Sequence, residues 1–219
     1  MNDALLVLNP RQIPECIEAI QALGIPTCWI SNMNETDAAQ ALNQAVHSTD
    51  MIDRYIVLSD DTVPTREALD LVRNVDAPAV TGYCNLDTGE YADIVNLTTN
   101  PLPPPPATGP SYHFMTRTQV EQHHQPTIPT TFAGLALTMM PRPYWQQFPF
   151  QVDPITGGQM DYDLSYRLQS AGIPIVAAVG AYVHHVKETW CRLDKNPAKR
   201  LLVGIEPPSV TWTNLSVPA

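Results

Sequence analysis

Two adjacent carboxylates, Asp60 and Asp61, directly follow the apolar run "RYIVLS" at residues 54–59. Neighbouring side chains at a strand end point in different directions, so one carboxylate can bind a divalent cation while the other accepts hydrogen bonds from a hydroxyl. Oxygen ligands suit Mg²⁺ or Mn²⁺, with a substrate phosphate filling the remaining positions. The pair is equally compatible with a solvated loop in which Asp61 caps the next helix.

A second pair of acids, Asp161 and Asp163, opens the helical pattern "MDYDLSYRLQSAG" at residues 160–172. Acids are favoured at the N-cap and in the first turn by the helix dipole, so a structural role is open to either residue. At a junction between loop and helix, Asp161 could also act as a general base that takes a proton from an acceptor hydroxyl.

Two adjacent histidines, His184 and His185, lie in the strand-like segment "AYVHHV" at residues 181–186. The alternation of side chains along a strand sends the two rings to opposite sides, so at most one of them faces a site beside the sheet. A histidine at a strand end is more often structural than a metal ligand, and both roles stay open here.

The elements that must position these residues alternate between short apolar strands and amphipathic helices. Strands are predicted at residues 4–8, 26–31, 54–59 and 77–83, and helices at residues 14–24, 35–48 and 65–74, the second with Thr36 or Asp37 as its N-cap. This order is typical of a parallel α/β sheet with right-handed crossovers. Ligands bind beyond the carboxyl ends of the strands in such sheets, which is where Asp60 and Asp61 stand.

The second half of the chain is less regular. The proline-rich segment at residues 100–110 is predicted to be a loop or linker and not a domain boundary. A strand is expected at residues 130–140, a helix that follows the pair Gly157-Gly158 and stops at Gly172, and one or two strands at 173–186. We therefore predict one domain over residues 1–194, followed by a tail at residues 195–219 that packs on the domain or is partly flexible.

Composition narrows the classes of partner. The net charge of −10, from 12 basic and 22 acidic residues, makes nucleic acid an unlikely partner without excluding a local basic patch. An anionic small ligand would therefore most readily be neutralised by a divalent metal.

The four cysteines form no CxxC pair, which fits a reduced, cytoplasmic protein. No secretory signal or membrane-spanning segment is predicted, and GxGxxG, GxxxxGK[ST] and GxSxG motifs are absent from the sequence.

Four segments carry a resemblance to a known family. The segment "MDYDLSYRLQSAGIPIVAAVGAYVHHV" (160–186) combines an acidic helix start, a glycine stop, an apolar strand and histidines, and three others accompany it: "RYIVLSDDTVP" (54–64), "DAAQALNQAV" (37–46) and "TFAGLALTMMPRPYWQQFPF" (131–150). Together they resemble the small inverting glycosyltransferases of family 2, over roughly residues 4–186. The resemblance implies a GT-A-like (nucleotide-diphospho-sugar transferase) three-layer α/β sandwich with a mainly parallel central sheet.

The resemblance also implies roles for individual residues. Asp61 would bind Mn²⁺ or Mg²⁺, and His184 would approach the metal or the diphosphate of the donor. Asp60 would contact the ribose or sugar of a nucleotide-diphospho-sugar donor, and Asp161 would be the general base. The predicted topology of the sheet, and not the resemblance, adds three donor-binding candidates at the ends of the first two strands: Asn9, Arg11 and Asn32.

The sequence departs from the family pattern at two positions and leaves the substrates open. Ser59 stands where the first acid of the metal motif is expected, and Met160 where a glutamate precedes the base. A catalytically inactive nucleotide-sugar binding module of the same fold is therefore the first alternative, and a nucleotidyltransferase the second. The hydroxyl acceptor could be a saccharide, a lipid-linked sugar, a protein side chain or a modified base.

Overall fold

The structure is a computed structural model that describes residues 1–31, 34–86, 91–95, 114–152, 160–186 and 210–215. The proline-rich segment at residues 100–110 and the candidate Asn32 lie outside these ranges.

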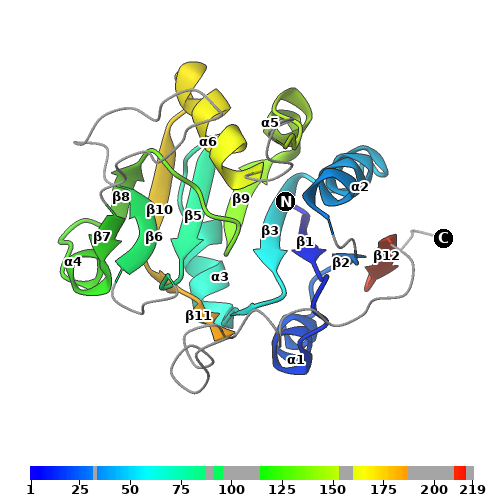
Figure 1. Ribbon diagram of the computed structural model, residues 1–219, viewed down its shortest axis with the longest axis horizontal. Helices are drawn as coiled ribbons and strands as arrows, with labels where there is room; N and C mark the ends of the chain where they lie inside the picture. Colours follow the sequence, from blue (N-terminus) through cyan, green and yellow to red (C-terminus); the bar gives the residue numbers. More distant parts are fainter. Residues whose placement is uncertain (32–33, 87–90, 96–113, 153–159, 187–209, 216–219) are drawn as a thin grey trace.

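An eight-stranded sheet forms the centre of the molecule, in the order β12-β2-β1-β3-β9-β5-β10-β8 (Figure 1). Its strands are β1 (Asp3–Leu8), β2 (Thr27–Ile30), β3 (Arg54–Ser59), β5 (Ala79–Tyr83), β8 (Thr127–Thr130), β9 (Thr138–Pro141), β10 (Ile175–Tyr182) and β12 (Val210–Thr213). The pairings make β1, β2, β3, β5 and β10 point in one direction, and β8, β9 and β12 in the other. The prediction of an α/β fold with a mainly parallel central sheet is confirmed.

Helices cover both faces of this sheet (Figure 1). Helices α1 (Pro14–Ala22) and α3 (Arg66–Arg73) lie on one face, and α2 (Glu35–His47), α5 (Arg142–Gln147) and α6 (Met160–Ser170) on the other. Strand β1 shows why: Ala4 and Leu6 pack in the core with α2 and α6, whereas Leu5 and Val7 pack in the core with α1 and α3. A strand that is apolar on both sides is the expected pattern of a covered parallel sheet, and it produces three layers.

A smaller unit lies beside the edge of the sheet, next to β8 and β10 (Figure 1). It consists of the antiparallel pair β6 (Tyr91–Val95) and β7 (Phe114–Thr116), followed by helix α4 (Arg117–Glu121). A capping box at Thr116 and Gln119 begins α4, and Arg117 lies 4.1 Å over the ring of Tyr182 in β10. Phe114 of β7 lines the cavity described below.

Two local predictions were wrong. The strand expected over residues 130–140 is two strands, because β8 pairs with β10 at one edge whereas β9 lies between β3 and β5, so that the chain must cross the sheet between them. Residues 131–137 are the irregular connection. Helix α2 begins at Glu35, as expected, but its N-cap is Asn34 and not Thr36 or Asp37, because the side chain of Asn34 accepts a hydrogen bond from Asp37 N–H at 2.8 Å.

The expected tail contributes to the sheet. Strand β12 pairs antiparallel with β2, with Trp212 opposite Cys28. The predicted boundary at residue 194 lies outside the described ranges and stays a prediction.

Within the described residues, no helix has both the length and the apolar character required to span a membrane.

Candidate active site

A cavity of about 490 Å³ opens beyond the carboxyl ends of β1 and β3. Its walls come from strand ends, from the N-termini of α2 and α6, and from the connection at residues 131–137. The acidic, basic and histidine side chains among its described lining residues are Arg11, Glu35, Asp61, Asp161 and His185. Asp61 and Asp161, which are far apart in the sequence, therefore share one cavity.

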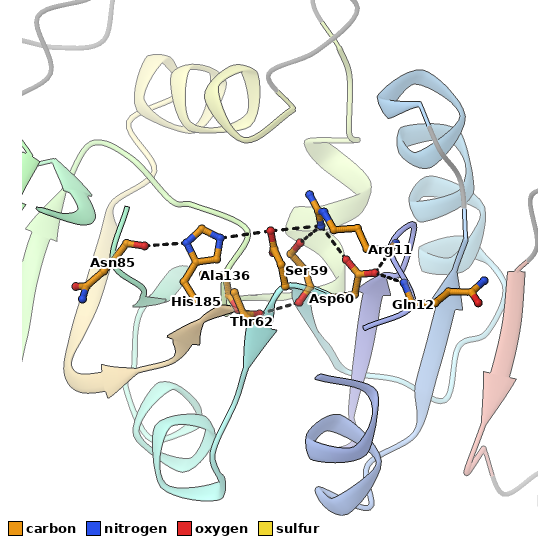
Figure 2. A network of polar contacts seen from close by, with 9 residues as sticks. Arg11, Gln12, Ser59, Asp60, Thr62, Asn85, Ala136 and His185 are labelled. Atoms are coloured by element: carbon orange, nitrogen blue, oxygen red, sulfur yellow. Dashed lines mark hydrogen bonds and ion pairs between the residues drawn. The ribbon is translucent and has the colours of Figure 1, made fainter. Parts of the chain in front are cut away.

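The carboxylate of Asp60 lies beneath the loop that leaves β1, and it is fully buried. The backbone N–H groups of Arg11 and Gln12 donate to Asp60 Oδ2 at 2.6 and 2.8 Å (Figure 2). Gln12 has a φ of 52°, and the turn at this residue directs two successive N–H groups at one oxygen. Burial raises the pKa of Asp60, against the opposing effect of Arg11.

These contacts place Asp60 differently from the sequence prediction. Asp60 was expected to contact the ribose or sugar of a donor, but it is not among the residues that line the cavity. Its oxygens are instead occupied by the loop that follows β1, so its observed contacts fix that loop and the position of Arg11.

Arg11 brings positive charge to the two adjacent carboxylates. Its Nη1 donates to Asp60 Oδ1 at 2.8 Å and to Ser59 Oγ at 3.2 Å, and lies 3.4 Å from Asp61 Oδ2. Both carboxylates are buried, at 0 % and 3 % exposure, so their mutual repulsion is not screened by solvent. The solvated loop that was the alternative reading of the pair is excluded, and the N-cap of α3 is Thr65 rather than Asp61.

The short ladder between β4 (Thr62–Val63) and β11 (His184–His185) brings a histidine to Asp61. His185 pairs with Thr62, and Val186 N–H donates to Asp61 O at 2.8 Å. His185 Nε2 lies 3.3 Å from Asp61 Oδ2. Of the two adjacent histidines, the sequence prediction chose His184. The ring that lines the cavity is that of His185, because side chains alternate along the strand and the pairing register puts His185 on the inner side.

The contacts of His185 suit a bound cation. Its Nδ1 lies 2.8 Å from the carbonyl oxygen of Asn85, which can only accept, so Nδ1 carries the proton (Figure 2). The lone pair of Nε2 in the neutral ring then faces a carboxylate oxygen of Asp61, an arrangement that is favourable when a cation or a second proton lies between them. Carboxylate oxygen and imidazole nitrogen are both ligands of Mn²⁺ and related divalent ions.

The protein ligands available for such an ion are few. No group of three or more His, Cys, Asp or Glu side chains that could hold a metal occurs in the described part of the chain. Asp61 and His185 would thus leave most coordination positions to water or to substrate oxygens, as is common for Mg²⁺ sites that bind through substrate phosphates.

Asp161 stands at the beginning of α6, and its surroundings favour a base. Burial raises the pKa of Asp161 to about 6, although its Oδ1 accepts a hydrogen bond from Tyr162 N–H at 2.8 Å, and the nearby charge of Glu35 raises it further. A carboxylate with this pKa is a better proton acceptor than one in water and is still ionised at neutral pH. Asp161 and Asp163 both lie in the first turn of α6, as the structural alternative had it, and Asp163 pairs with Arg167 at 2.7 Å.

Two helix starts meet on this side of the cavity. Glu35, the first residue of α2, accepts a hydrogen bond from Met160 N–H, the first residue of α6, at 3.2 Å. Ser165 Oγ donates to Asp161 O at 2.7 Å and accepts from Ala133 N–H at 3.0 Å. These bonds tie Asp161 to α2 and to the 131–137 connection, so that its position depends on three segments.

Apolar side chains form much of the remaining lining. They include Phe114 and Phe132, whose rings meet edge to face with centroids 6.3 Å apart, and other apolar side chains: Leu86, Leu135 and Met160. The cavity therefore has a charged end at Asp61, Arg11 and His185, two further acids at the helix starts, Glu35 and Asp161, and an apolar part, which is the usual combination in a small-molecule site.

Of the other predicted donor-binding residues that the structure describes, one lines the cavity and one does not. Arg11 lines the cavity, whereas Asn9 is buried and is not among the lining residues. Asn9 Oδ1 has no hydrogen-bond partner in the described part of the chain. Sequence reasoning missed Glu35, and it named His184 where the structure places the ring of His185 in the lining of the cavity. The acidic start of the helix at "NETD" is a signal that could have drawn attention to Glu35.

Comparisons with known proteins show the fold. No protein-family model matches the chain, and no curated protein matches its sequence. The chain is similar to the crystal structure of A197 from STIV, with a TM-score of 0.53 and 13% identity over 81% of each chain. It also matches the catalytic domain of Drosophila beta1,4galactosyltransferase 7 in complex with xylobiose, with a TM-score of 0.44 and 10% identity over 85% of this chain and 71% of that one.

A third solved structure, GalNAc-T7 with UDP, GalNAc and Mn²⁺, matches with a TM-score of 0.49 and 9% identity. This match covers 84% of the present chain and 43% of GalNAc-T7, so the chain spans less than half of that protein. At these identities the likeness concerns the path of the chain and not its chemistry. The fold is thus a mixed α/β sandwich that A197 shares.

Proposed function

We propose that this chain is a metal-dependent glycosyltransferase that moves a sugar from a nucleotide-diphospho-sugar donor to a hydroxyl acceptor with inversion at the anomeric carbon. The observation that carries the proposal is that Asp61 and Asp161 line one cavity, with Arg11 and His185 beside Asp61. The resemblance of the segments that hold these residues to family 2 glycosyltransferases supports the same reaction.

The charged end of the cavity would take the diphosphate of the donor. Asp61 and His185 would hold Mn²⁺ or Mg²⁺, and when bound the ion would stabilise the negative charge that develops on the leaving nucleoside diphosphate. The guanidinium of Arg11 would bind phosphate oxygens, since its planar set of donors matches them. Asp60 would act through the loop that it fixes, by presenting Arg11 to the donor.

The base would act on the side of Asp161. As the bond between the anomeric carbon and the phosphate oxygen breaks, the acceptor oxygen forms its bond to that carbon from the opposite face, and Asp161 takes the acceptor's proton. The products are the inverted glycoside, the nucleoside diphosphate and a protonated Asp161, which returns its proton to solvent. No nucleophile from the protein is required.

A thermal-shift panel of UDP-, GDP-, CDP- and TDP-sugars, each with and without Mn²⁺, tests the proposal. A ligand that binds only the folded state, at a free concentration of a hundred times its Kd, stabilises the protein by about 2.7 kcal/mol. Stabilisation of this size raises Tm measurably. We expect one donor class to raise Tm, and to raise it more with Mn²⁺. A panel in which no nucleotide sugar changes Tm in either metal state would contradict the proposal.

Product analysis separates the alternatives. A glycosyltransferase releases a nucleoside diphosphate, or hydrolyses its donor slowly without acceptor, whereas a nucleotidyltransferase releases pyrophosphate. Donor binding without turnover under any acceptor would instead favour a nucleotide-sugar binding module.

The rate of transfer is expected to depend on pH through Asp161. Only the ionised carboxylate can accept a proton, and its pKa is raised to about 6. The kcat/KM for the acceptor, which reports ionisation of the enzyme before the acceptor binds, should therefore fall about tenfold per pH unit below pH 6 and approach a plateau above pH 7. A profile of kcat/KM from pH 4.5 to 8 measures this, after stability at each pH has been checked. A rate that stays constant down to pH 4.5 would exclude Asp161 as the base.

A further inference from the structure

Asp61 Oδ2 is shared between two neighbours. Arg11 Nη1 lies 3.4 Å from this oxygen, and His185 Nε2 lies 3.3 Å from it. The same Arg11 nitrogen has two further acceptors at shorter range, Asp60 Oδ1 at 2.8 Å and Ser59 Oγ at 3.2 Å. Arg11 is also the sole lysine or arginine among the described lining residues of the cavity.

We propose that Arg11 is an internal counter-ion for Asp61 which a nucleoside diphosphate withdraws, so that the divalent cation and the nucleotide bind cooperatively. The inference rests on the proposed function, since it concerns the same cation and donor. It adds that neither ligand binds tightly alone, and that one side chain couples them.

The coupling follows from charge. A divalent ion held by Asp61 and His185 would lie next to the guanidinium, in a buried place where like charges repel strongly. Arg11 contributes one positive charge against the two carboxylates of Asp60 and Asp61, so it already neutralises part of the negative charge that would attract a cation. The cation must therefore displace Arg11 from Asp61 or share the oxygen with it, and both weaken its binding.

The structure provides a route for this displacement. The main chain of Arg11 is fixed by its N–H bond to Asp60, whereas its side chain is 24% exposed and lines the cavity. The guanidinium can turn from Asp61 to an incoming phosphate while Asp60 Oδ1 and Ser59 Oγ remain within its reach. A diphosphate offers it several acceptor oxygens. Once Asp61 has been released, the cation can bind both the carboxylate and the phosphate.

Linkage makes the effect reciprocal. If a nucleotide raises the affinity for the cation by some factor, the cation raises the affinity for the nucleotide by the same factor. Coupling between two sites is typically 5- to 150-fold, and we expect a value of about tenfold or more here.

The first test measures Mn²⁺ binding to the protein without nucleotide, by the electron paramagnetic resonance signal of free Mn²⁺. Arg11→Gln removes the charge but keeps a donor for Asp60, and it should lower the Kd for Mn²⁺ about tenfold relative to the wild type. Arg11→Lys keeps the charge and should bind Mn²⁺ as weakly as the wild type does. Arg117→Gln is the control for net charge, because Arg117 pairs with Glu121 on α4 and is not among the described lining residues.

The second test needs no variant. The Kd of the wild type for UDP, GDP and CDP is measured by calorimetry without metal and with saturating Mn²⁺, after correction for the nucleotide–Mn²⁺ complex in solution. We expect the nucleotide that binds to do so about tenfold more tightly with Mn²⁺. In Arg11→Gln, this ratio should fall several-fold to the part that direct coordination of the phosphates by Mn²⁺ supplies, whereas Arg11→Lys should keep the wild-type ratio.

The outcomes separate the inference from the proposed function. If wild type and Arg11→Gln bind Mn²⁺ equally tightly, or if Arg117→Gln tightens binding as much, Arg11 is not the counter-ion, and the proposed function stands. If neither protein binds Mn²⁺ with any nucleotide, both the inference and the metal-dependent function fail. Should Arg11→Gln not fold, as judged by circular dichroism, the wild-type ratio alone decides, and a ratio of one overturns the inference.

Discussion

Replacing Asp61 with asparagine should lower the rate of sugar transfer roughly a hundred- to a thousandfold at saturating donor and Mn²⁺. The amide carries no charge, so it would hold the cation poorly, and the negative charge on the departing diphosphate would lose its stabilisation. The matching measurement is kcat by release of nucleoside diphosphate, together with the Kd for Mn²⁺ in the presence of nucleotide, which should rise in parallel.

The same substitution should not destabilise the fold. Asp61 is buried beside Asp60, and removal of one of two adjacent negative charges relieves repulsion that the single Arg11 compensates in part. We expect the Tm of Asp61→Asn to equal or exceed that of the wild type, as is common where a functional site costs stability. Asp70→Asn is the matched control, because Asp70 is an exposed acid on α3 that pairs with Arg73. Wild-type kcat in Asp61→Asn would remove Asp61 from the mechanism.

Replacing Asp161 with asparagine should lower kcat by roughly a hundred- to ten-thousandfold and leave nucleotide binding intact. This range is typical for loss of a general base. The asparagine oxygen can still accept the Tyr162 N–H, so the start of α6 should persist. A kcat measurement with the chosen acceptor, beside a calorimetric Kd for the nucleotide, separates loss of chemistry from loss of binding.

Asp163→Asn is the control for the Asp161 variant. Asp163 lies two residues away on the same helix and pairs with Arg167, and it is not among the described residues that line the cavity. Its loss should cost stability through the ion pair but little activity. Equal losses of kcat in the two variants would indicate that α6 as a whole has been disturbed and that Asp161 has no special role. The pH limb near pH 6 should also vanish from any residual rate of Asp161→Asn.

The sequence by itself determined the elements whose patterns are local. The third strand was predicted at residues 54–59 and observed at Arg54–Ser59, because a run of apolar residues that ends in two acids cannot extend the buried sheet. The late helix was likewise found where its spacing and Gly172 predicted it. The alternation of these elements led to the α/β fold and to the edge of the sheet at which Asp61 lies, since the crossover rules connect local order to topology.

Only the tertiary structure decided which groups meet. Because side chains alternate along a strand, the sequence predicts that His184 and His185 face opposite ways. The register between β4 and β11 decides which of the two rings reaches Asp61. The loop after β1 holds Arg11 beside Asp60 by hydrogen bonds from the backbone N–H groups of Arg11 and Gln12, and such bonds cannot be predicted from the spacing of side chains in the sequence. Glu35 reaches α6 because two helices from distant parts of the chain begin at the same cavity. Such contacts depend on long-range pairing and packing, whose free energy is spread over the whole fold and is not encoded in the residues beside them.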